Sequence, residues 1–123
     1  MNEAKTILLI DDDSRNIFAL TAVLKAKGFH ILSASSAQEG IQHLQNNQGI
    51  KVVLLDMMMP DMDGYEALRV IRGDGQISQV PIVAVTAQAM VGDREKCLEA
   101  GANEYVSKPI DVDYLLEILN RYN

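Results

Sequence analysis

The sequence predicts a single α/β domain built on a doubly wound parallel sheet. Five short apolar runs alternate along the chain with five longer amphipathic segments, and such strict alternation is typical of βαβ units with right-handed crossovers. Several of the runs are continuously apolar and rich in β-branched residues, as parallel strands covered on both faces are. Because 123 residues suit one compact domain, we expect a single unit over residues 1–123.

Each apolar run is expected to form one strand. The runs have the short length of strands and are bounded by turn and helix-start signals. In chain order they are Thr6–Ile10, Phe29–Ala34, Lys51–Leu55, Pro81–Val85 and Glu104–Val106.

The first three helices have recognisable ends. Ser14 can cap the first helix, whose inward face carries apolar residues through Leu24 and which Gly28 then stops. A capping box of Ser36 and Glu39 opens the second helix. Asp63 precedes the third, which carries Leu68 and Ile71 inward and has Gly73 after it.

The last two helices differ in predicted strength. The fourth is expected over Ala89–Ala100, ended by Gly101, and the fifth opens at Asp111. Gly92 falls inside the fourth, where a glycine costs about 1 kcal/mol relative to alanine. The first turns of this helix are therefore expected to be easily remodelled, although Gly92 as a tolerated surface glycine is the alternative.

Composition excludes several classes of protein. The net charge of −6 argues against nucleic-acid binding, which depends on clustered Lys and Arg. Cys97 is the only cysteine, so neither an intrachain disulfide nor a thiolate zinc site can form. No apolar run approaches the roughly 20 residues that span a bilayer. We therefore expect a cytoplasmic protein with no membrane or nucleic-acid partner.

An unusual combination of residues, most of them polar, stands at the carboxyl ends of the predicted strands. They are Asp11 and Asp12 after the first strand, Asp56 after the third, Thr86 and Ala87 after the fourth, and Lys108 after the fifth. Ligands of doubly wound sheets bind beyond these ends. Two carboxylates about 4 Å apart repel by roughly 4 kcal/mol at an effective dielectric near 20, so the aspartates require a cation. Oxygen ligands alone favour Mg²⁺.

Each of these residues also has an ordinary explanation. An aspartate after a strand often only caps a helix or starts a turn, and Asp13 is interpreted in that way. A tyrosine such as Tyr105 is a common strand residue. Lys108 is more informative because Pro109 follows it, which restricts its backbone and permits a cis peptide. The combination of these residues at separate strand ends favours a functional site.

The same residues resemble response-regulator receiver domains. The resemblance extends over essentially the whole chain and rests on four motifs: ILLIDDD at 7–13, LDMMMPDMDG at 55–64, VTA at 85–87 and YVSKP at 105–109. It implies a flavodoxin-like fold with strand order 2-1-3-4-5. It also implies phosphorylation of an aspartate by a histidine kinase or a histidine phosphotransfer protein, with a phosphorylation-dependent dimer or a downstream protein as further partners.

The resemblance assigns roles to individual residues. Asp56 would be the phosphoacceptor, and Asp11 and Asp12 the acidic pair that holds Mg²⁺ together with Asp56 and the backbone carbonyl of Met58. The phosphoryl group would be bound by Thr86, Ala87 and Lys108. Thr86 and Tyr105 would form the switch that changes the face of the fourth helix, fifth strand and fifth helix.

Two other functions use similar parts. A haloacid-dehalogenase-like phosphatase also has a strand-end Asp nucleophile with Mg²⁺, but it places a second Asp where this chain has Met58. A flavodoxin would carry a phosphate-binding loop rich in Ser, Thr and Gly where Asp11, Asp12 and Asp13 stand. A stand-alone regulator and a receiver excised from a hybrid histidine kinase are both compatible with the sequence.

Overall fold

A parallel five-stranded sheet in the order β2-β1-β3-β4-β5 organises the chain. This computed structural model describes residues 5–87 and 91–122. The elements alternate along the chain as β1 Thr6–Ile10, α1 Ser14–Ala26, β2 His30–Ala34, α2 Ala37–Asn46, β3 Ile50–Asp56, α3 Gly64–Gly73, β4 Ile82–Thr86, α4 Asp93–Glu99, β5 Glu104–Ser107 and α5 Val112–Asn120. The predicted α/β class and strand order are confirmed.

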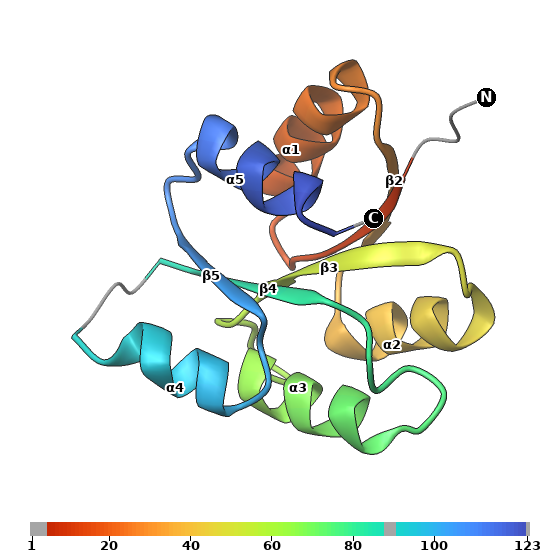
Figure 1. Ribbon diagram of the computed structural model, residues 1–123, viewed down its shortest axis with the longest axis vertical. Coiled ribbons are helices and arrows are strands. Elements are labelled where there is room, and N and C mark those ends of the chain that lie inside the picture. The colour runs from red at the N-terminus through yellow and green to blue at the C-terminus, as the bar shows by residue number, and fades with distance from the viewer. Residues whose placement is uncertain (1–4, 88–90, 123) are drawn as a thin grey trace.

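Helices cover both faces of the sheet. In Figure 1, α1 and α5 lie on one face, and α2, α3 and α4 lie on the other. Two apolar clusters match these layers. On the first face, Leu24 of α1 and Leu115 of α5 pack with sheet residues such as Val52. On the second, Leu68 of α3 and Cys97 of α4 join a separate cluster.

The central strand is buried along almost its whole length. Only Lys51 of β3 is exposed, while its neighbours Val52, Val53, Leu54 and Leu55 have no exposed surface. This pattern follows from a continuous apolar run between two helical layers. The observed strand continues one residue beyond the predicted Lys51–Leu55 and includes Asp56 itself.

Helix capping agrees with the sequence, with one correction. Ser36, Asp63 and Asp111 are the N-caps of α2, α3 and α5, as predicted. The cap of α1 is Asp13, whose side chain accepts the Arg15 N–H at 3.0 Å, and Ser14 is the first helical residue. The prediction of Ser14 as the N-cap was therefore wrong by one residue, because Asp13 occupies the N-cap position.

The fourth helix begins later than predicted. It spans Asp93–Glu99, and Gly92 precedes it as N-cap with φ of +86°, in the left-handed region that favours glycine. The predicted start at Ala89 lies outside the described residues. Gly92 is therefore not in a helix interior, and the predicted weakening of the helix by this residue was wrong.

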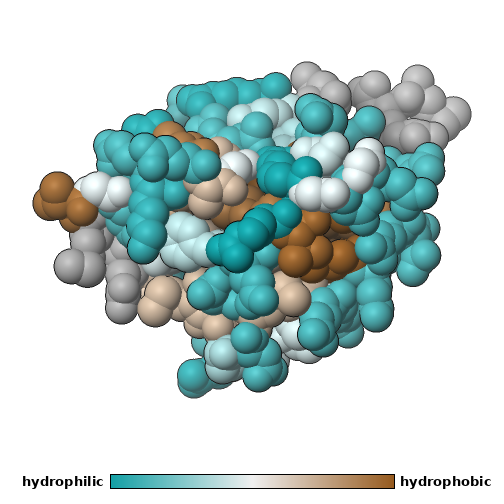
Figure 2. All heavy atoms as spheres, turned by 90° about the horizontal axis from the view of Figure 1, so that it is seen from below, coloured by the Kyte–Doolittle hydropathy of each residue, from teal (hydrophilic) through white to brown (hydrophobic). Residues whose placement is uncertain are grey.

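The surface on the side of α3 and α4 is mostly hydrophilic. Figure 2, viewed from below the orientation of Figure 1, shows apolar atoms only in limited areas of this face. In the part of the chain that the structure describes, no helix has both the length and the apolar content needed to cross a bilayer.

Candidate functional site

The carboxyl edge of the sheet collects the polar residues that the sequence placed at strand ends. Asp11 directly follows β1, Asp56 and Thr86 are the last residues of β3 and β4, and Lys108 directly follows β5. Asp11, Asp56 and Thr86 are the buried polar residues of the described chain, at 2%, 5% and 2% exposure. Four strands therefore deliver four polar side chains to one small region.

Three carboxylates of this region lie close together. Asp11, Asp12 and Asp56 each offer an oxygen, and these oxygens all lie within 4.8 Å of one another. Asp12 is exposed, whereas the other two are buried. Asp11 is oriented by the backbone N–H of Asp13, which donates to Asp11 Oδ1 at 2.8 Å. The predicted acidic cluster is thus formed, with one open side at Asp12.

Lys108 is the cation that faces this cluster. Its Nζ lies 3.5 Å from Asp11 Oδ2 and 3.6 Å from Asp56 Oδ2. The Lys108–Pro109 peptide bond is cis, and the Lys108 N–H donates to the Thr86 carbonyl at 2.8 Å. The backbone bond ties the start of the Lys108 loop to the end of β4.

Burial dominates the electrostatics of Asp56. Desolvation raises the pKa of its carboxyl above the ordinary value, and the nearby Asp11 raises the pKa further. The Met58 N–H, which donates to Asp56 Oδ1 at 3.0 Å, and the Lys108 ammonium lower the pKa. The charged form of Asp56 is therefore costly by itself and depends on these donors.

The loop after Asp56 is held down by its methionines. Met57 and Met59 are buried at 3% and 6% exposure, whereas the Met58 side chain is 51% exposed. A Cβ at position 64 would come within 2.6 Å of the Met57 Cα. Glycine at this position therefore allows α3 to begin close against the loop. Because Met57 and Met59 are buried, the loop is fixed on both sides of Met58, whose N–H donates to Asp56.

Thr86 and Tyr105 lie on neighbouring strands. Thr86 pairs with Ser107, and Tyr105 pairs with Ala84. Because side chains alternate along a strand, Thr86 and Tyr105 share one face of the sheet and are diagonal neighbours. Ala87 follows Thr86 and is exposed at the edge. The structure thus brings the predicted switch residues onto one face.

Sequence reasoning missed two polar residues near the site. Asn16 of α1 donates from Nδ2 to Asp11 Oδ2 at 2.5 Å. Asp93, the first residue of α4, accepts the Tyr105 hydroxyl at 3.1 Å. Asn16 lies five residues after Asp11, in the first turn of α1, and this position is only a weak signal. Nothing in the sequence around Asp93 pointed to Tyr105.

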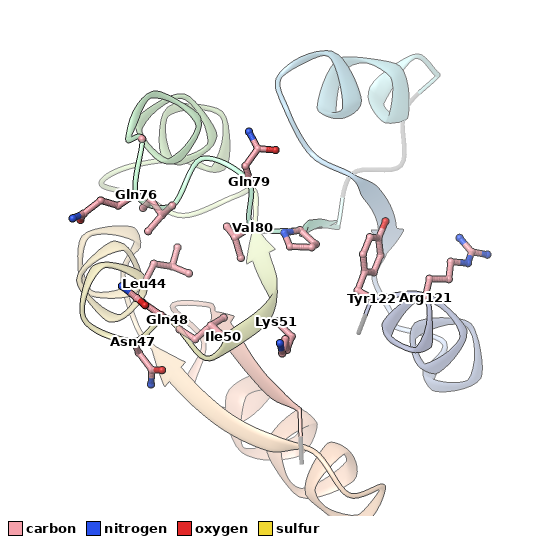
Figure 3. Close-up of a pocket in the computed structure, with 13 residues that line it drawn as sticks. Leu44, Asn47, Gln48, Ile50, Lys51, Gln76, Gln79, Val80, Arg121 and Tyr122 are labelled. Atoms are coloured by element: carbon pink, nitrogen blue, oxygen red, sulfur yellow. The ribbon is translucent and has the colours of Figure 1, made fainter. Parts of the chain in front are cut away.

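A hollow lies at the opposite edge of the sheet. It holds about 650 Å³ near the starts of β3 and β4, and its lining includes Leu44, Ile50, Gln76, Val80 and Tyr122. Figure 3 shows it between α2, the beginning of β3 and the segment before β4, with Tyr122 across from them. None of the strand-end residues lines it, so this hollow is separate from the charged site.

Comparison with known proteins identifies the family. The response regulator receiver domain matches residues 7–120. The chain is 34% identical to the histidine-protein kinase BarA of Escherichia coli strain K12, over 97% of this chain and 13% of the kinase. It is 32% identical to PilH of Pseudomonas aeruginosa, over 93% of each. This chain belongs to the response regulator receiver domain family.

A solved structure supports the same assignment. A response regulator receiver protein from Pseudomonas putida superposes on this receiver domain with a TM-score of 0.89 and 26% identity, over 98% of this chain and 99% of the other. The receiver domain is therefore a signalling module of two-component systems. The phosphatase alternative finds no support in these matches.

Proposed function

We propose that Asp56 of this receiver domain accepts a phosphoryl group from a phosphohistidine. The observation that carries this proposal is the position of Asp56. It ends the central strand at 5% exposure, with the Lys108 ammonium 3.6 Å from one oxygen and the Met58 N–H on the other. A nucleophile that is oriented by two donors and freed from bulk water suits in-line phosphoryl transfer.

The acidic cluster fits Mg²⁺. Asp11, Asp12 and Asp56 supply hard carboxylate oxygens within 4.8 Å of one another, and the exposure of Asp12 leaves room for water ligands. We propose that these three residues and the Met58 carbonyl hold the ion. When bound, Mg²⁺ would neutralise part of the negative charge that develops on the transferred phosphoryl group.

The transfer itself is simple in bonds. An oxygen of Asp56 attacks phosphorus, the P–N bond of the phosphohistidine breaks, and the imidazole nitrogen leaves with the bonding electron pair. Lys108 then exchanges its contact with Asp56 for one with a phosphoryl oxygen, and the Thr86 hydroxyl and Ala87 N–H bind another. The domain assists its own phosphorylation and does not turn over external phosphate esters.

Phosphorylation is proposed to act on the face formed by α4, β5 and α5. The acyl phosphate attracts the Thr86 hydroxyl, and movement of Thr86 changes the space beside its diagonal neighbour Tyr105. Tyr105 also lines a hollow of about 250 Å³ on this face, with Arg94 of α4 and Tyr114 of α5. The change is a shift between two populated conformations.

The phosphoryl donor is proposed to be a histidine kinase or a histidine phosphotransfer protein in the cytoplasm. The chain spans only 13% of the BarA kinase but 93% of PilH. These relatives support both a domain within a larger kinase and a single-domain regulator. We propose a single receiver domain over residues 1–123, and a downstream protein or a second phosphorylated copy as the partner of the switched face.

Small phosphoryl donors test the proposal directly. Acetyl phosphate or phosphoramidate with Mg²⁺ should add one phosphoryl group to the protein, seen by intact-mass spectrometry. Asp56→Asn should abolish this addition, whereas Asp61→Asn, which changes an exposed carboxylate in the following loop, should not. Equal phosphorylation of Asp56→Asn and the wild type would overturn the assignment.

Beryllofluoride tests the switch. It mimics the phosphoryl group, and with Mg²⁺ it should shift the amide resonances of Tyr105 and of α4. Shifts confined to the neighbourhood of Asp56 would show that Thr86 and Tyr105 do not relay the change.

A further inference from the structure

We propose that Asp93 is a positioning residue that latches Tyr105 and α4 in the unphosphorylated conformation. This inference rests on the proposed function of Asp56 and adds a regulatory contact to it. Each oxygen of the Asp93 carboxylate accepts a hydrogen bond from a tyrosine hydroxyl. Tyr65 of α3 donates to Oδ1 at 3.4 Å, and Tyr105 of β5 donates to Oδ2 at 3.1 Å. One carboxylate thus joins three elements.

The latch lies at the layer between the sheet and the helices. Tyr65 and Tyr105 are both partly buried against the apolar cluster that includes Cys97. The Tyr65 hydroxyl also lies 3.5 Å from Cys97 Sγ, and the Lys96 ammonium stands 4.9 Å from the centre of the Tyr65 ring. These contacts fix Tyr65, so one side of the latch is anchored on α3 and α4.

The bond from Tyr105 is the shorter of the two, at 3.1 Å compared with 3.4 Å for the bond from Tyr65. Burial raises the pKa of Tyr105, and the neighbouring Asp93 carboxylate raises the pKa further, so the hydroxyl remains a donor at neutral pH. A hydroxyl that donates to a carboxylate makes a charge-assisted bond, stronger than one between neutral groups. Tyr105 must give up this bond when its ring turns.

The latch also restrains the first residue of α4. Asp93 is the first residue of the helix, and its N-cap Gly92 provides no side-chain hydrogen bond. The tie of Asp93 to Tyr65 and Tyr105 therefore holds the start of the helix against α3 and β5. Release of Tyr105 would remove one of the two hydroxyl bonds to the Asp93 side chain, which couples the ring to the helix.

The pairing of Lys108 assigns the latch to the unphosphorylated state. Lys108 contacts Asp11 and Asp56, which are the partners available to it before a phosphoryl group is present. A contact that stabilises this state lowers the apparent affinity for any ligand of the other state. Loss of the latch should therefore tighten the binding of a phosphoryl mimic.

The test is a titration of beryllofluoride at saturating Mg²⁺, followed by NMR at Asp56 and neighbouring amides. Asp93→Ala should tighten the apparent Kd roughly threefold to tenfold, the effect of losing one charge-assisted hydrogen bond at a partly exposed site. Tyr105→Phe removes the same bond and should have a similar effect. Glu95→Ala, which removes an exposed carboxylate from the same helical turn, should leave the Kd within a factor of two.

A double-mutant cycle separates the latch from a merely structural role. If Asp93 acts through Tyr105, the double variant Asp93→Ala/Tyr105→Phe should bind beryllofluoride no more tightly than either single variant. Tyr65→Phe keeps the link to Tyr105 and should change the Kd less than Asp93→Ala does. Additive effects, or an unchanged Kd in Asp93→Ala, would overturn the latch while leaving Asp56 as the acceptor. Failure of the wild type to bind beryllofluoride would overturn both proposals.

Discussion

Two cationic side chains occupy opposite edges of the same sheet and are held in different ways. Arg72 of α3 donates to the carbonyl oxygens of Gly101, Ser78 and Val80 at 2.6 to 3.0 Å, and to Asn103 Oδ1 at 2.8 Å. Lys108, at the carboxyl edge, faces two carboxylates at 3.5 and 3.6 Å. Arg72 thus bonds neutral oxygens at close range, whereas Lys108 stands near charged ones at longer range.

The difference indicates what each charge does. The guanidinium of Arg72 ties the end of α3 to the segments that lead into β4 and β5, and desolvation lowers its pKa without a charged partner to compensate. Loss of the guanidinium would remove a donor from the partly buried carbonyls of Ser78 and Val80. Lys108 is 26% exposed and loses little by changing partner. One cation stabilises the fold, and the other is suited to follow a transferred charge.

The largest effect is expected when Arg72 is replaced, and it is on the stability of the fold. Arg72→Met should lower the free energy of unfolding by about 3 kcal/mol, because carbonyls of Ser78, Val80 and Gly101 lose their donor. Urea denaturation measures the change. Arg72→Lys is the control, since one ammonium cannot replace the planar fork, and it should recover less than half of the loss. A smaller loss for Arg72→Met than for Lys108→Met would contradict the assignment.

The second expected effect is on phosphoryl transfer. Lys108→Met should slow phosphorylation by acetyl phosphate about 100-fold, the cost of removing one preorganised electrostatic partner. Lys51→Met, at an exposed lysine beside the large hollow, should react within twofold of the wild type. Intact-mass spectrometry over time measures both rates. Similar slowing in both variants would mean that net charge and not position matters.

The acidic cluster gives a third, smaller effect. Asp12→Ala should weaken Mg²⁺ binding at least about tenfold, because it removes one of the oxygens grouped within 4.8 Å. Asp13→Ala should weaken it less than threefold, since the Asp13 side chain caps α1. Isothermal titration with Mg²⁺ measures both affinities. Equal losses in the two variants would refute this ranking.

The smallest expected effect concerns the stability cost of Asp56. Because burial raises the folded-state pKa of Asp56 above its ordinary value of 3.8, its stability contribution is full below that value and is lost as the pH rises through the folded-state pKa. Asp56→Asn should therefore raise the free energy of unfolding at pH 7 by about 1 kcal/mol. The gain should shrink as the pH falls toward 4, which urea titrations at several pH values measure. A constant gain would point to packing instead of charge.

Strand ends and helix caps were the parts of this protein that local patterns predicted well. The runs ending at Ile10 and Ala34 ended as expected, and the caps Ser36, Asp63 and Asp111 are in place. Such features depend on side chains and backbone groups within a few residues of each other. The alternation of strands and helices predicted a doubly wound parallel sheet, and the resemblance to receiver domains supplied the strand order that the structure shows.

Contacts between distant segments were the parts that local patterns did not predict. The four-way bonding of Arg72, the bond from Asn16 to Asp11 and the latch at Asp93 each join groups from different elements. The late start of α4 was also not predicted, although its cause is local. The helix was expected over Ala89–Ala100, whereas Gly92, with its positive φ, directly precedes the observed helix.

The sequence by itself determined the α/β class, the central strand that ends on Asp56 and the set of residues at the carboxyl edge, because burial pattern and chain order encode them. The tertiary structure decided the distances that give this set its chemistry. Lys108 lies 3.5 Å from Asp11 although the two are far apart in the chain. The hydroxyl of Tyr105 in β5 donates to Asp93 in α4. Side-chain partners of this kind depend on how strands and helices pack, which spacing along one chain does not specify.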